Sequence, residues 1–197
     1  MNESEKELSS EESLKLINRM IHEAKGYFHE SGLGALVYGF GVLLCSLLAY
    51  AVDVKMISFP FSPFYLLVPV FFVQSLIHWR ENKMKKAKTF TDETIDYVWT
   101  GFFLSAIAAF SANFAGKTYV TITIILFLAG FATFLTGMIA KFNYHKISGI
   151  ICLLLASVSF FMQDAIIYLL LAITAAMVWI IPGFILNMTF KKQQYAR

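Results

Sequence analysis

The sequence predicts an all-α integral membrane protein, with six transmembrane helices arranged as three helical hairpins and an amphipathic cytoplasmic helix before them. Composition is the first observation behind this prediction: of 197 residues, 58% are hydrophobic and only 15% are charged. A soluble domain usually has about 25% charged residues, so a soluble enzyme is excluded. The second observation is that the charges lie between apolar runs of about 20 residues, the length that crosses a bilayer as a helix.

Residues 1–31 are expected to form a cytoplasmic segment that contains the amphipathic helix. Its apolar residues recur at spacings of three and four, and they are Leu14, Ile17, Ile21, Ala24 and Phe28. Ser9 and Glu12 fit a capping box, and Ser31-Gly32 ends the helix. Three placements remain open, which are docking beside the basic loop, lying on the lipid surface and binding a partner. Ile17 and Ile21 are the candidate contact positions in each case.

The membrane domain is expected to cover residues 32–190, with a cytoplasmic tail of residues 191–197. In chain order the predicted spans are Leu33–Val52, Phe59–Trp79, Tyr97–Phe114, Tyr119–Ala140, Ile147–Met162 and Ala165–Met188. Short polar turns close the three hairpins. In the last of these turns, Asp164 is expected to accept hydrogen bonds from the free backbone N–H groups that begin the sixth span.

The distribution of Lys and Arg predicts the orientation. Fourteen of these 16 residues fall in the N-terminal segment, the loops after the second and fourth spans, and the tail, and only Lys55 and Lys117 fall on the other side. Because cytoplasmic loops retain positive charge, both termini are predicted to be cytoplasmic. The acidic first 30 residues lack the apolar region of a signal peptide, so the first span is expected to be an uncleaved anchor. A bacterial inner membrane is the expected location.

Small residues predict where the helices pack, since close packing drives helix association in lipid. The third span offers Gly101, Ser105 and Ala109, the fourth Ala129, Thr133 and Gly137, and the fifth Gly149, Cys152, Ala156 and Ser159. Pro69, near the middle of the second span, is expected to kink that helix because it removes a backbone donor. Cys45 and Cys152 lie at different depths of the membrane, so no disulfide is expected.

The predicted spans hold almost no ionisable residue, which an intramembrane enzyme or ion-coupled transporter would need. The best polar candidates are Gln74 and His78, four apart on one face of the second span, and Asn113 near the outer end of the third. Gln74 is interpreted first as an interhelical hydrogen-bond donor and second as a ligand contact. No spacing suggests a nucleophile with its base, or a phosphate-binding glycine loop. We therefore expect no enzymatic activity, no cofactor and no metal.

The leading functional expectation is a non-enzymatic sensing or scaffolding protein that acts through its cytoplasmic helix and basic loop. The basic loop contains Arg80, Lys83, Lys85, Lys86 and Lys88. The alternative is a small transporter, channel or lipid-binding bundle that uses the Pro69 kink and Gln74. Membrane lipids are the expected partners, with a cytoplasmic protein as a further option. Nucleic acid is not expected, because the basic residues form no continuous face.

Three stretches of the chain carry a resemblance to a family. They are LKLINRMIHEAKGYFHESG before the first span, LTGMIAKF at the end of the fourth, and IIPGFILNM in the sixth. With these stretches the chain resembles a group of small six-span bacterial inner-membrane proteins. The resemblance implies that fold and that location. The group has no assigned activity, so the resemblance implies no catalytic or binding residues.

Overall fold

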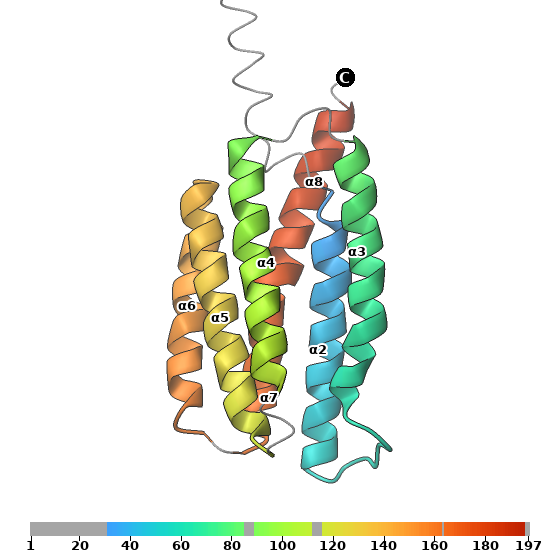
Figure 1. Cartoon of the computed structure of the whole chain (residues 1–197), viewed down its shortest axis with the longest axis vertical. Helices are drawn as coiled ribbons and strands as arrows, with labels where there is room; N and C mark the ends of the chain where they lie inside the picture. Colours follow the sequence, from blue (N-terminus) through green and yellow to red (C-terminus); the bar gives the residue numbers. More distant parts are fainter. Residues whose placement is uncertain (1–30, 85–88, 112–115, 163, 196–197) are drawn as a thin grey trace, which may run out of the picture.

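The computed structural model describes residues 31–84, 89–111, 116–162 and 164–195, and within these ranges the chain is helical, with no strand. The helices are α2 (Leu33–Asp53), α3 (Leu67–Met84), α4 (Phe90–Phe110), α5 (Thr118–Ile139), α6 (Asn143–Ser159), α7 (Ile166–Ala175) and α8 (Ile181–Tyr195). A 3₁₀ turn, η2 (Pro63–Leu66), precedes α3, and a π turn, η4 (Ala176–Ile180), joins α7 to α8. The helices run along the long axis of the molecule, and α8 continues the direction of α7 (Figure 1). The predicted N-terminal amphipathic helix lies outside the described residues.

Three helical stretches are long and apolar enough to cross a membrane, and they are Leu33–Asp53, Thr118–Ile139 and Ile166–Thr189. The other helices are more polar at one end or shorter. α3 has three charged residues between Arg80 and Lys83, α4 has three acidic residues between Asp92 and Asp96, and α6 has 17 residues in all. The all-helical fold class is confirmed, together with three helices of spanning length and hydropathy.

Helix pairing follows the predicted hairpins for only part of the chain. α2 packs against α3 and α4 packs against α5, as the first two hairpins require. However, α6 packs mainly against α5, and α7 packs mainly against α2. The third hairpin is therefore wrong as a packing unit, because Gly137 and Gly149 bring α6 to backbone distance from α5, and α7 packs on α2 instead.

Glycine brings α5 and α6 together at backbone distance. A Cβ atom placed on Gly137 would lie 2.5 Å from the backbone nitrogen of Lys146, and one on Gly149 would lie 2.6 Å from that of Phe134. The predicted packing faces of the fourth and fifth spans are confirmed, since each of their members is buried: Ala129, Thr133, Gly137, Gly149, Cys152, Ala156 and Ser159. These two helices form the tightest part of the fold.

The predicted packing face of the third span is wrong. Gly101 has no heavy atom within 4 Å of a Cβ placed on it, and the Ser105 side chain is exposed. α4 contacts the core instead through Trp99, Phe102 and Phe103. Large rings fill the space between α4 and its neighbours, so Gly101 and Ser105 face outward, whereas Ala109 is half-buried and its carbonyl accepts from the Thr121 hydroxyl of α5.

The predicted kink at Pro69 is also wrong. The helical part of this segment begins only at Pro63, and α3 begins at Leu67, so the predicted start at Phe59 is too early. Pro69 therefore lies in the first turn of α3. Backbone N–H groups in the first turn of a helix have no intrahelical acceptor. A proline there therefore removes no hydrogen bond of the helix and gives no reason for a kink.

Two smaller predictions are confirmed. The Asp164 carboxylate accepts a hydrogen bond from the Ile166 backbone N–H at 3.1 Å, at the start of α7. Cys45 and Cys152 are both buried and both free.

Small and hydroxyl-bearing side chains fill the interior, whereas large apolar side chains cover the outside. Thr133 and Thr136 are fully buried, and each donates to a carbonyl of its own helix at 2.7 and 2.8 Å. By contrast, Phe72 of α3 and Ile107 of α4 are each 69% exposed, and Leu154 of α6 is 62% exposed. Water-soluble proteins rarely expose such continuous apolar surface. This arrangement is typical of helices that associate within lipid.

We expect Gly149→Ala to lower the melting temperature of the purified protein in detergent. The added methyl group would overlap the Phe134 backbone and push α5 and α6 apart, at a cost of about 1–3 kcal/mol. Gly101→Ala is the matched control, because it faces open space and raises helix propensity by up to about 1 kcal/mol. We expect its melting temperature to be unchanged or higher. Equal destabilisation by both substitutions would contradict the close α5–α6 contact.

Candidate functional site

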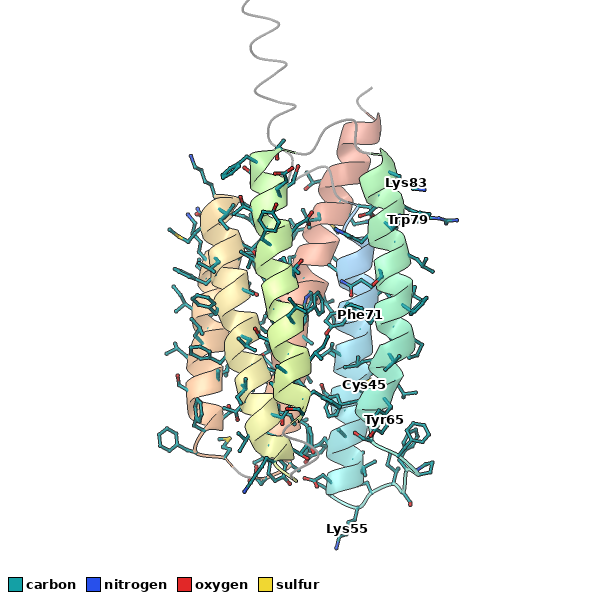
Figure 2. The ribbon with its side chains drawn as sticks, viewed as in Figure 1. Cys45, Lys55, Tyr65, Phe71, Trp79 and Lys83 are labelled. Carbon is teal, nitrogen blue, oxygen red and sulfur yellow. The ribbon has the colours of Figure 1, made fainter. Side chains whose placement is uncertain are left out.

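Positive charge gathers at one end of the bundle. α3, α5 and α8 end there, and the exposed residues Arg80, Lys83, Lys141 and Lys191 lie at or just beyond these helix ends. Figure 2 shows Lys83 and Trp79 at this end and Lys55 and Tyr65 at the opposite end. We call the first of these the basic end.

The start of α2 is fixed at the basic end. The Asn187 side chain of α8 donates from Nδ2 to the Ser31 carbonyl oxygen at 2.8 Å, and the Ser31 hydroxyl donates to the Glu81 carboxylate of α3. Gly32 has φ of 70°, and a Cβ atom there would overlap the Gly183 carbonyl oxygen. Only glycine fits both conditions. The chain therefore enters the bundle between α3 and α8.

α3 and α4 pack on different neighbours and meet each other at two side-chain contacts. The rings of Phe71 and Phe103 lie 5.2 Å apart between centroids, and His78 Nε2 lies 3.8 Å from Asp96 Oδ1. Figure 2 shows Phe71 between the two helices. The two contacts are seven residues apart on each helix, so the helices are antiparallel and the contacts are two turns apart. We call the stretch between these contacts the α3–α4 seam.

Two hydroxyl side chains lie along the seam. Ser75 lies between Phe71 and His78, at spacings of four and three, and Thr100 has the same spacings to the two contact residues of α4. Residues at these spacings share one helix face. Both side chains are exposed, and neither hydroxyl donates to a carbonyl of its own helix in the described chain. They form the outer rim of the seam.

Gln74 lies on the inner side of the seam, toward α2. Its Cγ is 3.7 Å from a Cβ atom placed on Gly34, and its Oε1 is buried without a hydrogen-bond partner among the described residues. The first interpretation, an interhelical hydrogen bond donated by the Gln74 amide, stays a prediction, because Oε1 is the acceptor of that amide. Leaving such a group unpaired costs roughly 1–3 kcal/mol.

Aromatic rings close the inner side of the seam. Tyr38 of α2 makes edge contacts with Phe103 at 5.6 Å and with Trp179 at 5.1 Å between centroids. Trp99 of α4 lies 6.0 Å from Trp179. Trp179 belongs to the π turn η4, which therefore packs against the inner side of the seam.

Pro182 accounts for the π turn. In η4 the Ile181 N–H donates to the Ala176 carbonyl, five residues back. In the same pattern, the next carbonyl, that of Met177, would accept from the N–H of residue 182, but Pro182 has no N–H. The Met177 carbonyl accepts instead from the Tyr144 hydroxyl of α6, at 3.1 Å. π turns occur frequently at functional sites, so this irregularity behind the seam agrees with a binding role there.

The described histidines do not form a metal site. No group of three or more His, Cys, Asp or Glu side chains that could hold a metal ion occurs in the described ranges. His145 is buried near the start of α6. His78 is exposed and pairs with Asp96.

The other predicted contact residues lie outside the described ranges, and they are Ile17, Ile21, Lys85, Lys86, Lys88 and Asn113. Of the predicted polar positions, Gln74 and His78 share the side of α3 that borders the seam. Sequence reasoning missed Ser75 and Thr100, because single hydroxyl residues in apolar runs look like packing residues. The signal that could have found them is their spacing. Ser75 lies four residues after Phe71 and three before His78, and Thr100 lies four residues after Asp96 and three before Phe103.

Comparison of the chain with models of known protein families, with curated proteins and with solved structures finds no match. The resemblance to six-span inner-membrane proteins stays a prediction. The functional argument therefore depends on the residues of this chain alone.

We expect Tyr144→Phe to destabilise the protein by about 1–3 kcal/mol, because it leaves the Met177 carbonyl without a donor. In a Pro182→Ala background a backbone N–H becomes available to that carbonyl, so the same substitution should cost less. Unfolding in detergent of the wild type, the two single variants and the double variant measures the coupling energy between Tyr144 and Pro182. The same cost in both backgrounds would show that proline does not create the need for the hydroxyl.

Proposed function

We propose that the protein is a non-enzymatic six-span protein of a bacterial inner membrane, with both termini cytoplasmic, that senses or scaffolds through its basic end. The observation that carries this proposal is the separation of charge along the bundle. Arg80, Lys83, Lys141 and Lys191 lie toward one end, and Lys55 lies at the other. This separation is the pattern that the positive-inside rule predicts for an inserted bundle.

The outer surface supports six spans. α3, α4 and α6 have 18, 21 and 17 residues, which fall within the range of about 17–25 for a membrane helix. Each presents large apolar side chains outward, as Phe72, Ile107 and Leu154 do. The charged residues of α3 and α4 lie at the basic end, where lipid headgroups and water would meet them.

The entry of the chain supports a role for the N-terminal segment. Since Ser31 is bonded to Glu81 and Asn187, the residue that follows the N-terminal segment lies at the basic end. Residues 1–30 contain seven acidic and four basic side chains, so the basic end attracts them. The acidic helix and the basic loop together would form one cytoplasmic surface for a partner.

We expect single cysteines at Lys55, Lys117 and Asp164 to react with an impermeant maleimide added to intact cells. The background is Cys45→Ala with Cys152→Ala, which removes both native thiols. Cysteines at Lys83 and Lys141 should react only after the membrane is opened, because these positions are placed on the cytoplasmic side. Labelling of Lys83 or Lys141 positions in intact cells would reject the six-span topology.

We expect Ile17→Asp with Ile21→Asp to release the N-terminal segment, because charge on the apolar stripe removes its contact with bundle, bilayer or partner. Protease cleavage near residue 20, measured in inside-out vesicles, should become several-fold faster. His22→Asp with Gly26→Asp adds the same charge on the opposite face and should leave the rate unchanged. Unaltered cleavage of the Ile17 and Ile21 variant would mean that the stripe does not hold this segment.

A lipid-binding bundle is the second candidate function, and Gln74 is the observation that favours it. A buried carbonyl oxygen without a partner is costly, and a ligand that donates a hydrogen bond would remove that cost. The version of this candidate that depended on a kink at Pro69 is dropped, since Pro69 lies in the first turn of α3.

A further inference from the structure

We propose that the loop between α2 and α3 and the turn between α6 and α7 bind the phospholipid surface of the bilayer, with their aromatic rings at the headgroup level. We call these segments the α2–α3 loop (residues 54–62) and the α6–α7 turn (residues 160–162). The inference goes beyond sensing or scaffolding at the basic end, because both segments lie at the opposite end of the bundle. It rests on the part of the proposed function that makes α3 and α6 membrane spans.

The α2–α3 loop is unusually apolar for a connection between helices. Its nine residues include five large apolar side chains and one charged residue, Lys55. Met56 is 75% exposed and Phe61 is 46% exposed, so the core of the bundle does not enclose them. Loops that face water are usually polar. This loop therefore has the composition of a segment that faces lipid.

The rings of the loop form a row. Between ring centroids, Phe59 lies 4.8 Å from Phe61, and Phe61 lies 6.5 Å from Tyr65 in the turn before α3. Figure 2 shows Tyr65 near the start of α3 and Lys55 beyond the end of α2. Aromatic rings are enriched at the headgroup level of a bilayer, where a lysine meets lipid phosphates. The rings and the cation of this loop fit that level together.

The α2–α3 loop runs along the side of the bundle. Figure 1 shows that α2 extends farther toward this end than α3 does, so the chain returns beside the helices to reach the start of α3. The next outward-facing residues of α3, Val68 and Phe72, are also exposed. The loop therefore continues the apolar outer surface of α3 toward the end of the bundle.

The backbone of the loop indicates its depth in the membrane. Lys55 has φ of 59°, and the chain turns back so that the N–H groups of Met56 and Ile57 donate to the Ala51 carbonyl at 2.9 and 3.3 Å. Residues 58–62, however, are neither helix nor strand. Irregular backbone does not face lipid in the hydrocarbon region, because its polar groups find no partners there. Water and ester carbonyls supply partners at the headgroup level, so the loop belongs at that level.

The α6–α7 turn presents similar side chains on another side of the bundle. Phe160 and Phe161 are 61% and 90% exposed, and the Phe161 N–H donates to the Val158 carbonyl at 3.1 Å. In Figure 1, α6 and α3 lie on opposite sides of the bundle. A partner protein or a second copy docked on one side would cover only one of the two segments. A bilayer surrounds the bundle and meets both.

The test measures the surroundings of a small fluorophore, nitrobenzoxadiazole, at single cysteines in the full-length protein. The background is the cysteine-free variant of the maleimide experiment, in phosphatidylcholine nanodiscs, which offer the same lipid and water at both faces. Phe61→Cys and Phe161→Cys report on the two segments, and Met56→Cys repeats the loop measurement without removing a ring. Lys117→Cys is the matched control, because Lys117 is an exposed polar residue at the same end.

We expect the labels at Met56, Phe61 and Phe161 to be quenched by a phosphatidylcholine that carries a nitroxide at the start of its acyl chain. Aqueous iodide should quench these labels several-fold less than the label at Lys117, because headgroups shield them from water. Iodide quenching equal to that at Lys117 would overturn the proposal. Shielding from iodide without quenching by the lipid nitroxide would also overturn it, since a protein would then cover the segments.

A label at Phe72→Cys separates this proposal from the six-span topology. Phe72 lies near the middle of the apolar part of α3 and is exposed, so a nitroxide at the end of the acyl chain should quench its label. Absence of that quenching would place α3 outside the bilayer and would overturn both proposals. Quenching at Phe72 together with full access of iodide to Phe61 would overturn only the binding of the loop to lipid.

Discussion

Backbone contact at glycine is the constraint on which this bundle depends. Between helices in lipid no hydrophobic force distinguishes a neighbour helix from an acyl chain, so association requires closer packing than lipid can give. Gly137 and Gly149 meet this requirement between α5 and α6, where each lies against the backbone of the other helix. Gly39 does the same for α2 against Trp179 and Ile180. The other helices take their positions around these fixed contacts.

α3 and α4 are held differently, and this difference creates the seam. α3 packs on α2 and α4 packs on α5, so two separately anchored helices face each other across the bundle. They touch through Phe71 with Phe103 and through His78 with Asp96. Rings and long polar side chains keep helix axes farther apart than glycines do. A polar strip can therefore persist at a depth where the rest of the surface is apolar.

The parts of the fold that could be predicted are those that periodicity alone decides. Hydrophobic runs predicted helices, and small residues at spacings of three and four predicted the packing faces that contain Gly137 and Gly149, although not that these two faces pack on each other. The same rule failed at Gly101 and Ser105, because a small-residue face does not reveal whether another helix reaches it. Pro69 was misplaced because the start of α3 depends on the 3₁₀ turn at Pro63, which apolar composition hides. Gln74 and His78 could be named from sequence, but Ser75 and Thr100 became visible only once the contacts of Phe71 with Phe103 and of His78 with Asp96 had defined the seam.

The bond between Tyr144 and the Met177 carbonyl has a consequence for the order in which the chain is made. The last helix contains a carbonyl that its own backbone cannot satisfy, because Pro182 has no N–H to give. Tyr144 precedes Pro182 in the chain, so during synthesis the donor is available before the acceptor exists. The final helix can therefore complete its hydrogen bonding as it joins the others, without an interval in which a bare carbonyl faces lipid.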